Sequence, residues 1–144
     1  MGVLVGVVDL AEHNRLVPSL IELFIRLSAE SAMSGLPAKG YFTERYARIR
    51  TGTARAIRGA QRAGFVLTDV DAESAALRLT ATMDGLQLQW LLDRDVNMAY
   101  ALGQMIREWL TLDGITEFEA IGSRVHRADP EVRSYRNTPE PPAT

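Results

Sequence analysis

The sequence predicts an all-α fold, a single helical bundle domain, from three observations. Apolar residues recur every three or four positions through most of the 144 residues, which is the period of an amphipathic helix. Only residues 3–8 (VLVGVV) resemble a buried strand, and a lone strand cannot pair its backbone, so residues 3–14 are interpreted as a helix. Residues 71–92 have the pattern of a helix that is apolar on two opposite sides, which is more than the surface helix of a monomer requires.

The next part of the chain contains two predicted helices separated by a loop. Residues 18–33 form the first of these, because Pro18 suits a first helical turn and leucines and isoleucines follow at helical spacing. Residues 34–40 (SGLPAKG) are a predicted loop, since two glycines and a proline interrupt the pattern. Residues 41–62 form a long, Arg-rich helix that Gly64 is expected to end.

The helix predicted over residues 71–92 can begin at either of two capping aspartates, Asp69 or Asp71. Its first apolar stripe comprises Ala76, Leu79, Met83, Leu86 and Trp90. Its second apolar stripe comprises Leu77, Ala81, Leu88 and Leu92. One stripe covers the chain's own core, and the other is expected to meet a second copy of the chain. The pattern leaves open which of the two stripes faces the partner.

Asp95 is expected to cap a further long helix, residues 96–112, whose apolar arc is also wider than one contact requires. Two such pairs of helices, one from each subunit, would form a four-helix bundle across a two-fold axis. Residues 116–128 have a weaker helical period and complete a predicted domain of residues 1–128. Residues 129–144 contain four of the six prolines and no apolar pattern, which predicts an extended or disordered tail.

Composition narrows the possible classes of protein. Apolar residues make up 47% of the chain, as in a globular domain. The net charge of −2 provides no overall field that would attract nucleic acid or an anionic membrane. The absence of cysteine excludes disulfides and thiolate metal sites. No apolar run is long enough to span a membrane and no signal peptide is apparent, so a cytoplasmic protein is expected.

Motifs that carry chemistry are lacking, so neither an enzyme, a metal site nor a cofactor is predicted. His13 and His126 have no second metal ligand at helical spacing. Asp93 and Asp95 are better explained as helix-end residues than as a catalytic carboxylate pair. No nucleotide-binding loop or nucleophile motif is present. The arginines of residues 41–62 are interpreted as a solvated basic face, because no aromatic residues alternate with them.

Aromatic, thioether and amide side chains on inward arcs predict an apolar pocket between helices, with plain core packing as the alternative. The candidate ligand-binding residues are Phe24, Leu27, Tyr46, Ile49, Met83, Gln87, Trp90 and Trp109. The candidate dimer-interface residues are Leu77, Ala81, Leu88, Leu92, Met98, Leu102 and Met105. The predicted partners are therefore a second copy of the chain and a small hydrophobic ligand.

Four segments resemble the C-terminal region of TetR-family transcriptional regulators. They are residues 41–50 (YFTERYARIR), 64–71 (GFVLTDVD), 75–79 (AALRL) and 84–93 (DGLQLQWLLD), of which the last is the most telling. The resemblance covers residues 3–112. It implies an all-helical domain, a four-helix bundle at the dimer interface, and a pocket whose ligand shifts attached DNA-binding domains between two states.

The helix-turn-helix patterns with which such regulators begin are not found in this sequence. The chain would thus be a fragment, an isolated sensor domain, or a reading frame whose start was placed late, and would reach DNA only through a missing domain. The resemblance implies an effector-sensing and dimerisation domain that binds a small, largely apolar ligand. The alternative is a stand-alone dimeric helical protein that binds a hydrophobic molecule without a role in transcription. A helical enzyme is a third hypothesis that no residue supports.

Overall fold

The computed structural model describes residues 1–34 and 38–128, which contain helices and no strand. In order these are α1 (Gly2–Asn14), α2 (Pro18–Ser34), α3 (Ala38–Arg62), α4 (Ala72–Leu92), α5 (Met98–Arg107) and α6 (Leu112–Ala128). The all-α fold is therefore confirmed, including a helix where residues 3–8 resembled a strand. The predicted tail, residues 129–144, lies outside the described residues.

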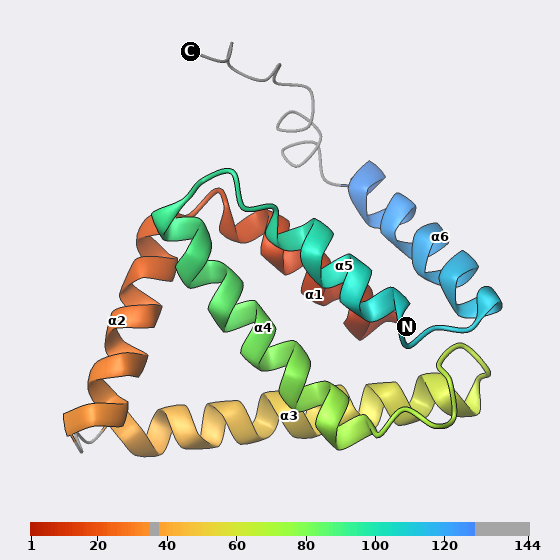
Figure 1. The fold of residues 1–144 in the computed structure, drawn as a ribbon, viewed down its shortest axis with the longest axis horizontal. Coiled ribbons are helices and arrows are strands. Elements are labelled where there is room, and N and C mark those ends of the chain that lie inside the picture. The colour runs from red at the N-terminus through yellow and green to blue at the C-terminus, as the bar shows by residue number, and fades with distance from the viewer. Residues whose placement is uncertain (35–37, 129–144) are drawn as a thin grey trace, which may run out of the picture.

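The helices enclose a triangular space (Figure 1). Helices α2, α3 and α4 form its three sides, and α2 and α3 meet at one corner. Helices α1 and α5 lie side by side beyond α4, which contacts α2, α3 and α5. Helix α6 packs against α1 at the opposite end from α2. This arrangement gives α4 neighbours along several sides, but it leaves one side without cover from the described chain.

The beginnings and ends of α3 and α4 follow the sequence signals. Gly64 ends α3 with a φ of 77°, a left-handed conformation that glycine adopts without steric cost. Asp71, and not the alternative Asp69, caps α4, because its side chain accepts a hydrogen bond of 2.7 Å from the backbone N–H of Ser74. Helix α3 begins at Ala38, three residues before its predicted start.

Helix α5 is much shorter than the predicted helix of residues 96–112. Its cap is Asn97 and not Asp95, since the Asn97 side chain accepts a hydrogen bond of 2.9 Å from the Tyr100 backbone N–H. The helix ends at Arg107. The Trp109 carbonyl accepts a 2.9 Å hydrogen bond from the Leu67 N–H.

The same junction continues into α6, which begins at Leu112 and not at Thr116 as predicted. The Thr111 N–H donates to the Phe65 carbonyl at 3.0 Å, and the Thr111 hydroxyl donates to the Gly64 carbonyl at 2.8 Å. A side chain on Gly114 would collide with the Phe65 backbone, so only glycine fits there. The loop after α3 thus pairs with the segment between α5 and α6, and this pairing replaces the last turns of the predicted helix.

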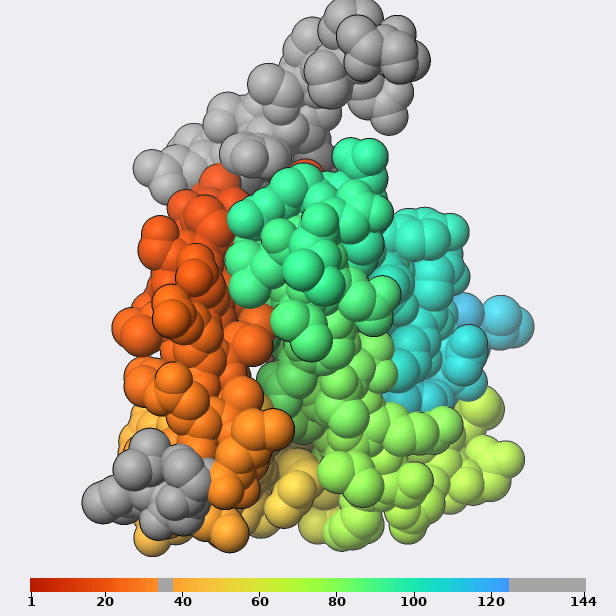
Figure 2. Space-filling model, turned by 60° about the vertical axis from the view of Figure 1, so that its left-hand side comes forward, coloured from red at the N-terminus to blue at the C-terminus, as the bar shows by residue number. Residues whose placement is uncertain are grey.

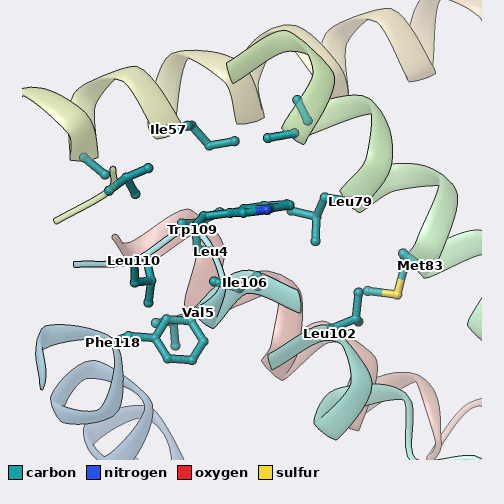
Figure 3. Close-up of a cluster of buried hydrophobic side chains, with 14 of the residues drawn as sticks. Leu4, Val5, Ile57, Leu79, Met83, Leu102, Ile106, Trp109, Leu110 and Phe118 are labelled. Atoms are coloured by element: carbon teal, nitrogen blue, oxygen red, sulfur yellow. The ribbon is translucent and has the colours of Figure 1, made fainter. Parts of the chain in front are cut away.

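The core lies where α1, α3, α4, α5 and the start of α6 converge, and Figure 3 shows its centre. The Trp109 ring lies between Ile57 on one side and Ile106 on the other, with Leu79 beside its edge. Of the first stripe of α4, four residues are buried and Leu86 is half-buried. The first stripe is therefore the one that packs on the chain's own core.

Candidate ligand-binding site

A cavity of about 370 Å³ lies between α1, α2, α3 and α4, within the range typical of small-molecule sites. Figure 2 shows α2 and α4 next to each other on one face, with the surface hollowed between them. Most of the lining is apolar, as expected of a site for a largely apolar ligand. The apolar lining residues are Val7, Leu10, Leu20, Ile21, Phe24, Tyr41, Ile49, Leu79 and Met83.

A hydrogen bond joins α3 to α4 in the wall of this cavity. The Tyr46 hydroxyl donates to the Asp84 carboxylate at 2.7 Å. Burial raises the pKa of Asp84, although the Tyr46 hydrogen bond and the nearby Arg45 charge act to lower it. Burial and the Asp84 carboxylate both raise the pKa of Tyr46, so its hydroxyl keeps its proton.

We expect the buried Asp84 carboxyl to make stability depend on pH. A carboxyl whose pKa is raised by folding stabilises the fold fully below its ordinary pKa of 3.8, and this contribution is lost as pH rises through the raised value. The stability of Asp84→Asn relative to wild type should therefore increase as pH rises from below 3.8 through the raised pKa of Asp84. Urea denaturation of both proteins across this range measures the difference.

Tyr46→Phe should change the pH dependence of stability in the direction opposite to that of Asp84→Asn. It removes the hydrogen bond that lowers the pKa of Asp84, so its stability should fall more steeply with rising pH than that of wild type. Parallel stability curves for wild type, Asp84→Asn and Tyr46→Phe would contradict the assignment.

Arg45 also lines the cavity, next to Tyr46 on α3. Its guanidinium carbon lies 5.1 Å from the centre of the Phe24 ring, a cation–π contact. Within the described part of the chain it forms no ion pair and no hydrogen bond, and its Nε is buried without a partner. The cavity wall therefore contains a cation whose hydrogen-bonding capacity is not used by the protein.

Besides Thr80, whose hydroxyl donates a hydrogen bond of 2.9 Å to the Ala76 carbonyl, the lining contains three neutral polar side chains that are buried: Asn14 on α1, Thr53 on α3 and Gln87 on α4. They are only 5%, 6% and 6% exposed. None of them forms a side-chain hydrogen bond with another described residue. Since buried polar groups are normally paired, these three are available to a bound molecule.

The structure brings five of the eight candidate ligand residues together around the cavity: Phe24, Tyr46, Ile49, Met83 and Gln87. The other three do not line it. Leu27 faces outward from α2 and is half exposed, while Trp90 and Trp109 are buried in the core. Arg45 and Asp84 are not among the ligand-binding residues predicted from the sequence. In the sequence, a charged residue on the polar side of a helix resembles one that is exposed to solvent.

The second stripe of α4 remains uncovered in the single chain. Leu77, Leu88 and Leu92 are 51%, 47% and 82% exposed, and Ala81 between them is exposed as well. Met105 on α5 borders this surface and is half-buried, with its sulfur 3.5 Å from the Thr82 hydroxyl. We call these five residues, Leu77, Ala81, Leu88, Leu92 and Met105, the α4–α5 surface.

Two of the candidate interface residues do not belong to that surface. Met98 and Leu102 are completely buried in the chain's own core. They point toward α1 and the core from the inner side of α5, so they offer no area to a second subunit. The wide apolar arc of residues 96–112 had suggested contact with a partner, but α1 covers most of that arc.

A family model described as the C-terminal domain of BetI-type transcriptional repressors matches residues 37–114. The match spans α3, α4 and α5, which hold most of the cavity's polar groups and the α4–α5 surface. It covers more than half of the chain. The chain belongs to this family. No curated protein and no solved structure matched it in the corresponding comparisons.

As a BetI-type domain, the chain is a TetR-type C-terminal domain, which confirms the resemblance read from residues 41–93. Membership points to the effector and dimerisation domain of a transcriptional regulator. None of the helices in residues 1–34 and 38–128 is both long and apolar enough to cross a bilayer. The same residues contain no cluster of acidic and histidine side chains suited to a metal ion.

Proposed function

We propose that this domain senses a small, largely apolar ligand for a TetR-like transcriptional regulator and joins two subunits into a dimer. The observation that carries the proposal is the cavity between α1, α2, α3 and α4 in a domain of this family. It combines an apolar lining with a few inward polar groups, as small-molecule sites do. DNA contact is assigned to a separate helix-turn-helix domain, and a cytoplasmic location follows from this role.

Dimerisation is proposed to occur through the α4–α5 surface. Leu77, Leu88 and Leu92 are about half exposed or more on one side of α4, an apolar surface that a partner subunit would remove from water. A second copy of α4 and α5 would cover them in a four-helix bundle related by a two-fold axis. The family match supports this role over that of a stand-alone ligand-binding protein.

Helix α4 connects the two proposed functions. Asp84 lines the cavity and lies one helical turn from both Ala81 and Leu88 of the α4–α5 surface. A ligand that contacts Asp84 or Gln87 therefore acts on the same turns of α4 that would meet the partner subunit. If the dimer has two states that differ in the position of α4, a ligand that binds one state more tightly shifts the equilibrium toward that state.

Two variants on α2 test whether the ligand occupies this cavity. A thermal-shift screen with small apolar and aromatic compounds first identifies binders, because ligands of the folded state raise the melting temperature. Phe24→Ala should then weaken binding about tenfold, roughly 1.4 kcal/mol, because Phe24 lines the cavity. Leu27→Ala should leave affinity unchanged, because Leu27 lies one turn further along α2 and does not line the cavity.

The melting temperature of each ligand-free variant serves as the control for folding, since Phe24 also contacts the Phe42 ring at 5.5 Å. Equal affinities for wild type and both variants would place the ligand elsewhere in the molecule.

A further inference from the structure

We propose that the ligand of this cavity is an amphipathic carboxylate, whose anionic head is bound by Arg45 and whose apolar tail lies against the hydrophobic lining. This inference rests on the proposed ligand-sensing function and adds the chemical class of the ligand.

Unlike six other arginines of the described chain, Arg45 has no acidic partner within ion-pair distance among the described residues. Arg48, Arg58 and Arg107, for example, pair with Glu44, Glu73 and Glu119 on the outer surface. Arg45 instead lines the cavity beside the Phe24 ring, with its Nε buried and unpartnered. A buried donor without an acceptor is unfavourable, so an acceptor supplied by the ligand would stabilise the complex. A guanidinium and a carboxylate match in both charge and geometry.

Asp84 is the other ionisable group that could select the ligand's charge, and its environment argues against a cationic ligand. Its carboxylate already accepts the Tyr46 hydroxyl hydrogen bond. Burial also favours its protonated form. The Tyr46 hydroxyl and the nearby Arg45 charge already face the Asp84 carboxyl, so a cationic ligand would have to compete with both.

The second independent observation is the set of buried amide and hydroxyl groups in the same wall. Asn14, Thr53 and Gln87 are more than nine-tenths buried, line the cavity and have no side-chain partner among the described residues. Each can donate a hydrogen bond to a ligand oxygen. Much of the remaining wall is apolar, including Leu10, Ile21, Ile49, Leu79 and Met83. Donors on one part of the wall and apolar surface on the rest suit a molecule with one oxygen-rich end and a hydrocarbon body.

Three compounds with the same chain and different heads test this inference: octanoate, octanamide and octylamine, which are anionic, neutral and cationic at neutral pH. Isothermal titration of the full chain should find that octanoate binds at least about tenfold more tightly than octylamine, a difference of roughly 1.4 kcal/mol. Arg45→Met should reduce octanoate affinity to about that of octanamide, while octanamide affinity changes little. Arg45→Lys keeps the charge and should retain the preference for octanoate.

Arg48→Met is the matched control, because Arg48 lies on the same helix, is exposed, and pairs with Glu44 at 3.8 Å outside the cavity. It should leave all three affinities unchanged. Circular dichroism melting curves check that each variant is folded. Tightest binding by octylamine, equal binding of the three compounds, or an unchanged preference in folded Arg45→Met would each overturn the carboxylate assignment while leaving a ligand cavity in place. Failure of all three to bind would overturn it too, and the Phe24 and Leu27 variants would then judge the cavity separately.

Discussion

Leu88→Arg should convert the proposed dimer into monomers. Leu88 lies in the middle of the α4–α5 surface and is 47% exposed in the single chain, so arginine is tolerated in the monomer. In the dimer it would place a charge without a partner in an apolar contact, at a cost of about 3 kcal/mol or more. Since two copies meet across a two-fold axis, each dimer would contain the charge twice. The dissociation constant should rise by more than about a hundredfold, which sedimentation velocity can measure.

The matched control for this prediction is Leu23→Arg. Leu23 is also an exposed helical leucine, 53% accessible, but it lies on the outer side of α2, away from the α4–α5 surface. It should sediment as wild type does. A dimer that persists in Leu88→Arg, or one that is lost equally in Leu23→Arg, would show that the subunits do not meet through this part of α4.

Trp109→Ala should destabilise the fold by about 3–5 kcal/mol, the range found when a large buried aromatic side chain is truncated. The ring is 3% exposed and lies at the centre of the core, and Arg78 covers it at 5.5 Å. Urea denaturation at fixed protein concentration measures the loss.

Tyr100→Ala tests whether the loss comes from burial and not from removing any aromatic ring on this part of the chain. Tyr100 is 64% exposed on α5, so its truncation should change stability by no more than about 0.5 kcal/mol. Trp109→Phe should lie between the two, since it keeps part of the buried area. If Trp109→Ala proved as stable as wild type and lost only ligand affinity, Trp109 would be a cavity residue after all.

Features set within one helix could be predicted from the sequence. The helical periods, a cap at Asp69 or Asp71, the terminating Gly64 and the two stripes of residues 71–92 each depend on neighbours at most a few positions away. This is why α1, α2, α3 and α4 lie close to their predicted positions, whereas α5 and α6 have different bounds. Five candidate ligand residues likewise line the cavity, because the inward side of a helix can be read from its period.

Contacts between distant segments were decided only by the tertiary structure. Residues 108–111 continue a helical pattern, yet they leave the helix because they can pair with residues 64–67, some 45 positions earlier. Both stripes of α4 are equally apolar, and only the placement of α3 and α5 buries one and exposes the other. Arg45 and Asp84 have the sequence context of surface charges, and the packing of α2 against α3 and α4 encloses them in the cavity wall. Helical periodicity reports which residues share a side, but it contains no information on which neighbour, if any, covers that side.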